Sequence, residues 1–315
     1  MSVVTIVGSY IVAMVMDVER IPIAGETLTG RNFHRTHGGK GSNMAACAAR
    51  LGAATRFLGK VGNDTPGDEF LELMDREGVD RSAVLISDTK PTAAGFILVG
   101  DNGSNLIVID PAANGDLSPA DVTVHRDLIA SSEVVLSPLE IPLATALAAA
   151  AVAKAANKKF ILNPAPALDL RTADLSAVFA LTPNESESRV CLGLRADDPM
   201  PDDEVAHQLL ALGPENVMLT RGEKGVLWAC AHGTTVLPAL SVQAIDTVGA
   251  GDAFNAGLAV GLSEGKTTLE AIALGVAAAS LSTQRRETIA SYAYREEVEP
   301  HLAALLNTAH AFESE

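Results

Sequence analysis

Basic residues and cysteines are both scarce in this 315-residue chain, and each shortage excludes a class of partner or site. Lys and Arg together number 23 against 39 Asp and Glu, so the formal net charge is −16. A chain this acidic is not typical of proteins that bind nucleic acid or anionic membranes. The three cysteines, Cys47, Cys191 and Cys230, form neither a metal-binding pattern nor an even disulfide set. We therefore expect reduced thiols in a cytoplasmic protein.

Long apolar runs, internal repeats and low-complexity tails are missing as well. The N-terminal run Val3–Val7 has no basic segment before it and ends at Gly8, so no signal peptide is predicted. The apolar stretch at residues 144–153 is rich in alanine and too short to span a bilayer. The length suits one large α/β domain with a small appendage.

What the sequence does contain is a regular alternation of strand-like and helical segments. Apolar runs predict strands at residues 3–7, 55–61, 83–86, 134–136, 159–162, 177–181 and 217–220. Helices are predicted at residues 44–51, 67–77, 143–156, 251–262 and 269–283 and from Glu185 onwards, with a hairpin at residues 225–237. Such alternation is typical of an α/β fold with a mainly parallel sheet and helices on both faces. We assign residues 1–10, 38–93 and 110–315 to this main domain.

Two segments, residues 11–37 and 94–109, interrupt the alternation. Both are strand-like, and Asp-Asn-Gly-Ser at residues 101–104, between two apolar runs, is a strong hairpin signal. We expect the two segments to pair as a small β-sheet lid over the edge of the main sheet at which α/β proteins bind ligands. A small sheet leaves edges uncovered, so a homodimer formed through the lid is also expected.

A glycine-rich loop at residues 246–255, Asp-Thr-Val-Gly-Ala-Gly-Asp-Ala-Phe-Asn, opens an apolar helical segment. Gly249 and Gly251 permit backbone conformations in which N–H groups converge, and the positive end of the helix adds to them, so the loop suits an anion. Asp252 stands at this anion site, where a carboxylate is out of place unless it handles a proton. The structural alternative is that Asp252 caps the helix.

A second glycine-rich loop, Gly-Gly-Lys-Gly-Ser-Asn at residues 38–43, also precedes a helical segment. It lacks the G-x-x-x-x-G-K-[ST] spacing of a Walker A loop. Close backbone approach at Gly39, with Lys40 and Asn43 as donors, suits sugar hydroxyls as well as phosphates. Alone, the motif is compatible with a plain turn. Two such loops, about 210 residues apart in one α/β chain, are much more specific.

Together the two loops resemble the two signatures of the ribokinase-like (PfkB-type) carbohydrate kinase family, and the resemblance extends over nearly the whole chain. Between them, Asn-Pro-Ala-Pro-Ala at 163–167, Thr-Pro-Asn-Glu-Ser-Glu at 182–187 and Thr-Arg-Gly-Glu-Lys-Gly at 220–225 follow the family's order and spacing. The resemblance implies ATP-dependent phosphorylation of the hydroxymethyl group of a pentose-like sugar, with Mg²⁺ as a cofactor. The implied partners are therefore a small sugar and ATP.

The resemblance also implies roles for individual residues. Asp252 matches the catalytic base, and the backbone of Gly249, Ala250 and Gly251 matches the anion hole. The sugar-binding positions correspond to Gly39, Lys40, Asn43 and Glu140, and the nucleotide-binding positions to Asn184, Thr220, Gly222 and Gly251. Glu187 completes an N-x-x-E motif that organises Mg²⁺ through water, and Asp246 and Val248 match part of a monovalent-cation (K⁺) site. The structural alternatives are a solvated helix residue at Glu187 and a strand end at Thr220 and Gly222.

Two departures from the family pattern concern the substrate and the cation. Ribokinases carry Asn and Asp two and four residues after the Gly-Ser that follows the first strand, and that Asp binds the vicinal hydroxyls of the sugar. This chain has Ile11 and Ala13 instead, so D-ribose in the usual pose is not expected. The alternatives are a substrate with fewer hydroxyls there, a bulkier apolar substrate, or recruitment of Asp17. Glu287 replaces a glycine near the cation loop and would either ligate the cation or replace it.

Two other functions stay open. One is a nucleoside kinase in which Ile11, Ala13 and Met14 form an apolar pocket for a base. The other is a non-catalytic sugar or nucleotide sensor on the same fold, although the intact Asp252 favours catalysis. Four further polar residues receive structural roles: a solvated strand face for His34 and His37, and a helix C-terminus for Arg285 and Arg286.

Overall fold

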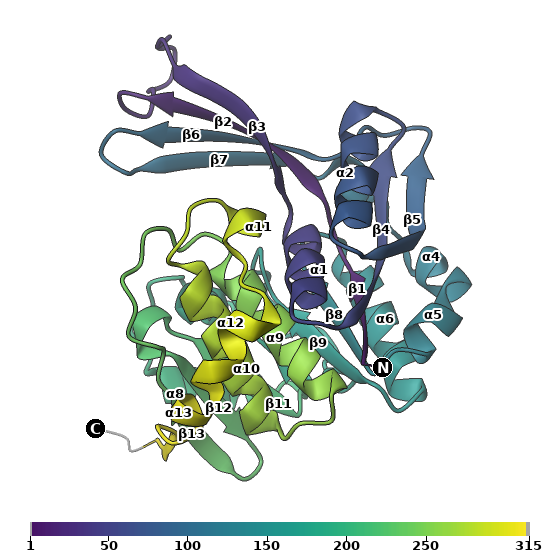
Figure 1. Cartoon of the computed structure of the whole chain (residues 1–315), viewed down its shortest axis with the longest axis vertical. Coiled ribbons are helices and arrows are strands. Elements are labelled where there is room, and N and C mark those ends of the chain that lie inside the picture. Colours follow the sequence, from purple (N-terminus) through teal and green to yellow (C-terminus); the bar gives the residue numbers. More distant parts are fainter. Residues whose placement is uncertain (1, 313–315) are drawn as a thin grey trace.

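The computed structural model describes residues 2–312, and a ten-stranded sheet forms its centre (Figure 1). The strand order is β14-β13-β12-β11-β10-β9-β8-β1-β4-β5; the pairs from β11 to β5 are parallel, and β12, β13 and β14 extend one edge antiparallel. The predicted α/β fold with a mainly parallel sheet is confirmed. The bounds are β1 (Val3–Val7), β4 (Ala54–Gly62), β5 (Asp80–Ser87), β8 (Val134–Pro138), β9 (Lys159–Asn163), β10 (Ala180–Leu181), β11 (Asn216–Thr220), β12 (Val226–Cys230), β13 (Gly233–Leu237) and β14 (His310–Ala311).

Helices cover both faces of this sheet, and each face has its own buried apolar cluster. On one face lie α1 (Lys40–Arg50), α2 (Thr65–Arg76), α9 (Ala250–Ser263), α10 (Thr268–Ser282), α11 (Thr288–Ser291), α12 (Arg295–Val298) and α13 (Leu302–Leu306). On the other lie α4 (Pro119–Val124), α5 (Arg126–Ala130), α6 (Leu143–Ala155), α7 (Glu185–Cys191) and α8 (Asp202–Leu210), and α3 (Ala112–Gly115) is a single turn. Among residues 2–312, no helix is long and apolar enough to cross a membrane.

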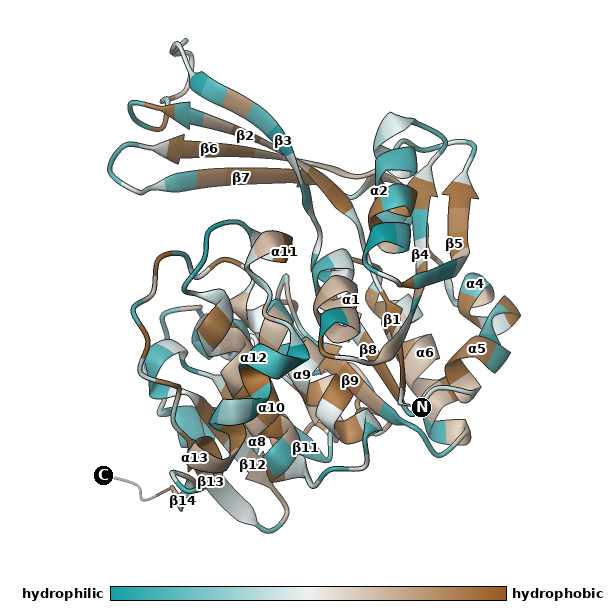
Figure 2. Ribbon diagram, viewed as in Figure 1, coloured by the Kyte–Doolittle hydropathy of each residue, from teal (hydrophilic) through white to brown (hydrophobic). Residues whose placement is uncertain are grey.

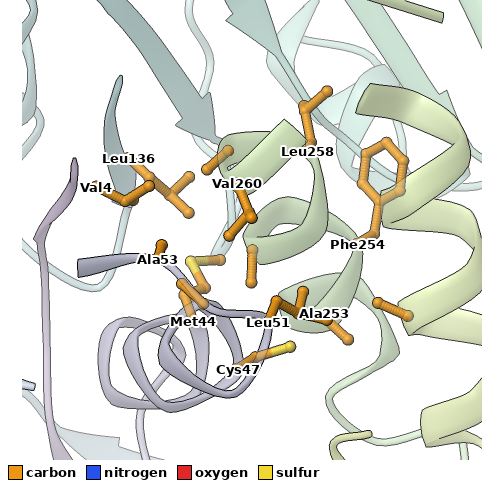
Figure 3. Close-up of a cluster of buried hydrophobic side chains, with 14 of the residues drawn as sticks. Val4, Met44, Cys47, Leu51, Ala53, Leu136, Ala253, Phe254, Leu258 and Val260 are labelled. Atoms are coloured by element: carbon orange, nitrogen blue, oxygen red, sulfur yellow. The ribbon is translucent and has the colours of Figure 1, made fainter. Parts of the chain in front are cut away.

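Helices α1 and α9, which follow the two glycine-rich loops, pack against each other. Figure 3 shows Met44 and Cys47 of α1, and Leu51 directly after it, gathered with Ala253 and Val260 of α9 in the first cluster. On its other side α9 lies so close to α10 that a Cβ on Gly257 would be 2.7 Å from Cα of Gly275. Since a close-packed interior resists displacement, the N-termini of α1 and α9 are held in fixed relative positions.

Three predicted element boundaries are wrong by three residues or more, one of them the start of β5, which is Asp80 instead of residue 83. Helix α1 begins at Lys40 instead of residue 44, because Gly39, with φ 92°, turns the chain directly out of β3 and serves as the N-cap. Lys40 and Asn43 therefore lie on the helix rather than in a loop before it. The strand predicted at residues 177–181 shortens to Ala180–Leu181, because Val178 N–H donates to the carbonyl of Leu175 in a turn.

The two inserted segments pair into a separate four-stranded sheet, as predicted. Its strands are β2 (Ile11–Val18), β3 (Arg31–Gly38), β6 (Ala94–Gly100) and β7 (Asn105–Asp110), in the order β3-β2-β6-β7, and β2 and β6 run parallel. We call it the small sheet. It extends away from the main sheet and over α11 (Figure 1), and apolar residues dominate β6 and β7 (Figure 2). Phe96 and Val108 are more than half exposed, so this sheet presents apolar surface to solvent.

Candidate active site

The first turns of α1 and α9 meet, and their side chains are joined. Asn43 Nδ2 donates to Asp252 Oδ2 over 2.8 Å, and Lys40 Nζ lies 3.9 Å from Asp252 Oδ1. Asn43 and Asp252 are buried, whereas about a third of the Lys40 side chain is exposed, 32%. The donors of the first glycine-rich loop and the carboxylate of the second thus form one cluster, although 209 positions separate Asn43 from Asp252.

Asp252 does not cap the helix. Gly249 is the N-cap of α9, and Asp252 stands three residues further, in the first helical turn. Burial raises the pKa of Asp252, while the charge of Lys40 and the hydrogen bond from Asn43 lower it, and the net effect is a raised pKa. A buried carboxylate with a raised pKa has a greater affinity for a proton, which suits it to act as a base.

Gly249 is required by its surroundings. Its φ of 81° lies in the left-handed region, and a Cβ there would be 2.4 Å from Cγ2 of Thr288 and 2.8 Å from Oη of Tyr292. The Tyr292 hydroxyl donates to the carbonyl of Gly249 over 3.3 Å. The N–H groups of Gly251 and Asp252 belong to the first helical turn, where a helix leaves its donors free for an anion.

The Ala250 N–H is less available to an anion than its position in the motif predicts. Its N–H donates to the carbonyl of Thr247, although at 3.3 Å this bond is long. The donors that face an anion without such competition are therefore those of Gly251 and Asp252.

Glu140, which follows β8, is bound to the start of α1. Its Oε2 accepts from the Ser9 hydroxyl over 2.5 Å and from the Lys40 N–H over 2.7 Å. Burial raises the pKa of Glu140, and the opposing effects of the Ser9 hydrogen bond and of Lys40 do not cancel it. The backbone approach depends on Gly39, since a Cβ there would be 2.7 Å from the Ile11 nitrogen.

The charges around Lys40 favour its protonated form. Burial lowers the pKa of Lys40, but the nearby carboxylates of Asp252, Glu140 and Glu187 outweigh it, and the pKa is raised. Lys40 therefore remains a cation between three acidic groups.

One buried acceptor in this cluster is unused. Oδ1 of Asn43 is buried and has no hydrogen-bond partner among the described residues. Leaving a buried acceptor unpaired costs about 1–3 kcal/mol. Since Nδ2 of the same amide is held by Asp252, Oδ1 is positioned to accept from a ligand hydroxyl.

A groove with a volume of about 870 Å³ runs from the N-terminus of α9 toward β11. Its wall includes all four residues predicted to bind nucleotide, Asn184, Thr220, Gly222 and Gly251. Apolar side chains complete the wall, among them Leu240, Val242 and Val276. The groove is large enough for a nucleotide and apolar enough to hold its base, with the anion hole at one end.

Asn184 and Glu187 bind each other at the start of α7. Asn184 Oδ1 accepts from the Glu187 N–H over 2.8 Å, and Glu187 Oε2 accepts from the Asn184 N–H over 2.8 Å, which forms a capping box. Burial raises the pKa of Glu187, and the charges of Lys40 and Asp252 also act on it. Glu187 is therefore a helix cap whose carboxylate also lies within electrostatic reach of Asp252.

The proposed cation loop lies next to Gly249. The Val248 N–H donates to Asp246 Oδ1 over 3.0 Å, and the Asp246 N–H donates to the carbonyl of Thr283. Glu287 is exposed and has φ 67° and ψ 161°, a region that disfavours any residue but glycine and costs of order 1–3 kcal/mol. It directly precedes Thr288, which contacts Gly249.

Three sequence-based expectations about the small sheet are wrong. Successive strand residues face opposite sides, so Met14 cannot line one pocket with Ile11 and Ala13. Asp17 lies about 13 Å along the strand from Ala13 and accepts from Asn32 Nδ2, so it is too distant to replace a carboxylate there. His37 is half-buried and bonds to the Tyr10 hydroxyl over 3.0 Å rather than lying on a solvated face.

The other side chains with structural expectations lie where they were predicted. His34 is exposed, and Arg285 and Arg286 are exposed just beyond the end of α10, where Arg285 pairs with Glu297.

Sequence reasoning missed four residues that hold this site. Thr182 Oγ1 donates to Asn255 Oδ1 over 2.6 Å, and Asn255 Nδ2 donates to the carbonyl of Gly251 over 2.8 Å. Ser9 and Tyr292 hold Glu140 and Gly249, as described above. Ser9 carried a local signal, because it follows a parallel strand by two residues at the edge where α/β folds bind ligands. Thr182 and Asn255 lie within motifs that the sequence analysis quoted, but the bond between them depends on tertiary packing.

Comparisons with known proteins agree with this geometry. The model of the pfkB family carbohydrate kinases matches residues 1–294. A ribokinase from Haemophilus influenzae is 37% identical over 293 residues, which cover 93% of this chain and 96% of that protein. A deoxyribokinase from Salmonella typhi is 33% identical over 254 residues, which cover 80% of this chain and 82% of that protein.

Solved structures show the same fold. The structure of Arabidopsis thaliana ribokinase complexed with ribose and ATP superposes with a TM-score of 0.87 at 29% identity, covering 96% of this chain and 99% of that one. The family match spans both glycine-rich loops and the joined pair Asn43 and Asp252. The chain therefore belongs to the pfkB family of carbohydrate kinases, which are phosphotransferases.

Proposed function

We propose that this chain transfers the γ-phosphoryl group of ATP to the hydroxymethyl group of a pentose-like sugar, with Asp252 as the general base. The observation that carries the proposal is the buried Asp252 carboxylate, bound by Asn43 at the N-terminus of α9. Asp252 accepts the proton of the attacking hydroxyl as its oxygen bonds to the γ-phosphorus, while the bond from the γ-phosphorus to the β,γ-bridging oxygen breaks and ADP leaves. The N–H groups of the first turn of α9 stabilise the charge on the transferred phosphoryl group.

The polar cluster at the start of α1 binds the sugar. Oδ1 of Asn43 accepts from one hydroxyl, and Glu140, already held by Ser9 and the Lys40 N–H, accepts from another. Lys40, which lies near the carboxylates of Asp252 and Glu140, donates to the substrate. These contacts fix the hydroxymethyl group against Asp252, and such positioning provides much of the rate of a phosphoryl transfer.

ATP fits the groove beside α9. The related Arabidopsis thaliana ribokinase binds ribose and ATP together, and here the groove and the Asn43–Asp252 pair meet at Gly251. We assign Asn184, Thr220, Gly222 and Gly251 to the nucleotide, with the apolar wall around its base.

Two cations belong to this proposal. When bound, Mg²⁺ would neutralise phosphate charge, and Glu187 would hold it through water. Among the described residues, no group of three or more acidic, His or Cys side chains is suited to a metal. The donor set therefore fits an ion that is held mainly by phosphates and water. The loop from Asp246 to Val248 would hold K⁺ beside the anion hole. Exchange of K⁺ for Na⁺ should change kcat if that loop is occupied, and unchanged kcat would exclude the site.

The small sheet is proposed to act as the lid over the sugar and to form a homodimer in the cytoplasm. Its exposed apolar residues, including Phe96 and Val108, favour burial against a second copy. Sedimentation at micromolar concentration should show a dimer, and a monomer would contradict this part of the proposal.

The function is tested with a panel of sugars and nucleosides incubated with ATP and Mg²⁺. We expect ADP formation and a phosphorylated pentose-like sugar, detected by mass. Binding of sugar and ATP without turnover of any member would instead indicate the sensor function, and phosphorylation of nucleosides alone would indicate a nucleoside kinase.

A further inference from the structure

The two faces of β2 have different surroundings at its base. Tyr10 and Val12 face α2: the Tyr10 ring stacks on Phe70 at 4.6 Å, and both residues line a polar cavity of about 430 Å³ with His37 and Glu69. Because side chains alternate along a strand, Ile11 and Ala13 face the opposite side. That is the side of the first glycine-rich loop, since a Cβ on Gly38 would lie 3.6 Å from Cβ of Ala13.

A row of residues that is apolar except for Thr36 at its β3 end crosses the small sheet on this face. Thr36, Ala13, Gly95 and Ile109 are direct partners in neighbouring strands. A Cβ on Gly95 would lie at ordinary contact distances, 3.4 Å from Ile11 Cγ2 and 3.7 Å from Ile109 Cγ1. We call Ile11, Ala13, Gly95 and Ile109 the apolar wall. Its side chains offer no hydrogen-bonding atom.

The one polar side chain in the row is Thr36, whose single uncharged hydroxyl lies at the β3 end beside Ala13. Asn114 is buried behind β2, but its amide bonds to the Tyr10 backbone N–H and carbonyl, over 3.3 and 2.8 Å. Asp17 lies about 13 Å along the strand. A hydroxyl directed at the wall itself would lose its water without gaining a charged partner, which disfavours a diol at this position.

We propose that the substrate turns a C–H edge, not a vicinal diol, toward the apolar wall, so that the preferred substrate class is a deoxygenated pentose-like sugar. This inference rests on the proposed kinase function. The polar cluster of Lys40, Asn43 and Glu140 binds the hydroxyls on the near side, and the wall accepts the carbon skeleton at the end of the sugar remote from the hydroxymethyl group. Ala13 and Gly95 are thereby specificity-determining residues.

The test compares kcat/KM for D-ribose and 2-deoxy-D-ribose, with ATP and Mg²⁺, in the unmodified enzyme and in two matched variants. A13D places a carboxylate on the wall, and M14D places the same carboxylate on the opposite face of the strand. We expect the unmodified enzyme to favour 2-deoxy-D-ribose or to accept both equally. A13D should shift the ratio toward D-ribose by about tenfold or more, the scale of one hydrogen bond to a charged group, and M14D should leave the ratio unchanged.

Each outcome decides one question. Preference of the unmodified enzyme for D-ribose by about a hundredfold, the size expected where a polar group is built to bind the hydroxyl, would overturn the inference but leave the kinase function standing. Equal shifts in A13D and M14D would also overturn it, because the shift would not come from the wall. If A13D fails to fold, A13S replaces it, and the ratio of the kcat/KM values should then shift toward D-ribose by a smaller factor. Phosphorylation of neither sugar would overturn the proposed function, and the inference with it.

Discussion

The two sides of the active site are built in opposite ways. The side formed by α1, α9 and Glu140 is buried and charged, and its members bind one another: Asn43 holds Asp252, and Ser9 holds Glu140. The side formed by the small sheet presents the apolar wall, is one layer thick and is partly exposed. The polar groups of the first side are therefore preorganised by tertiary packing, whereas the residues of the apolar wall make only van der Waals contacts through their side chains. Changes on the first side should affect rate and stability, and changes on the second should affect mainly selectivity.

The largest effect is expected for Asp252→Asn. The amide keeps the size of the carboxylate and still accepts from Asn43, so the KM values should change little, whereas kcat should fall by about 10²–10⁴ because the proton acceptor is lost. Steady-state kinetics with calorimetric binding would separate the two. Asp17→Asn, on the small sheet, is the matched control and should keep full kcat. If Asp252→Asn retained more than about a tenth of kcat, Asp252 would not be the base.

The second comparison sets a buried ion pair against an exposed one. Arg50 of α1 binds Glu77 through two bonds of 2.8 and 3.0 Å, and the two side chains are only 13% and 8% exposed. Glu77→Gln should lower the free energy of unfolding by about 3 kcal/mol, because it leaves a buried charge uncompensated. Asp101→Asn breaks the half-exposed pair with Arg31 on the small sheet and should cost less than about 1 kcal/mol. Similar losses in urea unfolding would contradict the contrast.

The third comparison uses one substitution in two glycines. Gly249→Ala should destabilise by about 2 kcal/mol and lower kcat, since its φ is positive and its Cβ would overlap Thr288 and Tyr292. Gly95→Ala meets only ordinary contacts, so the stability should change by less than about 1 kcal/mol. Thermal unfolding and kcat of both variants provide the measurement, and a larger loss at Gly95 would show that the small sheet is the more tightly packed region.

The smallest effect is expected in the pH dependence of stability. As pH falls, one carboxylate from each region changes the free energy of unfolding in the opposite direction to the other. The pKa of Asp252 is raised by burial, so the folded state binds this proton more tightly than the unfolded state, and the contribution of Asp252 to stability improves as pH falls. The pKa of Glu26, near the small sheet, is lowered to about 2 by its hydrogen bond with Arg20. Its contribution is present at neutral pH and is lost as pH falls below about 5.

Urea unfolding of the unmodified enzyme, Asp252→Asn and Glu26→Gln at several pH values checks these signs. Asp252→Asn should remove the improvement at low pH, and Glu26→Gln should remove the loss. If Asp252→Asn did not remove the improvement at low pH, the pKa of Asp252 would not be raised in the folded state. In activity, kcat/KM should decline as pH falls through the raised pKa of Asp252, because the protonated carboxyl cannot accept a proton.

Much of the fold was predictable because its signals are local. Alternating apolar segments predicted the parallel sheet, and the hairpin at residues 101–104 predicted the join between β6 and β7. The start of α1 was not predictable from helix propensity, since Gly41 and Ser42 are poor helix formers and are tolerated there by packing against Ser9. His37 was misplaced because its burial depends on Tyr10, a residue of the connection between β1 and β2 that lies far from it in the sequence.

The α/β class, the two glycine-rich loops and the apolar character of Ile11 and Ala13 could be read from the sequence, because each is a property of neighbouring residues. Only the tertiary structure decided which of these groups meet. The hydrogen bond between Asn43 and Asp252 exists because α1 and α9 pack against each other, and the placement of Ala13 and Gly95 in one row exists because β2 and β6 pair in one register. Contacts between distant segments depend on the closure of a whole packed core, which local propensity does not contain.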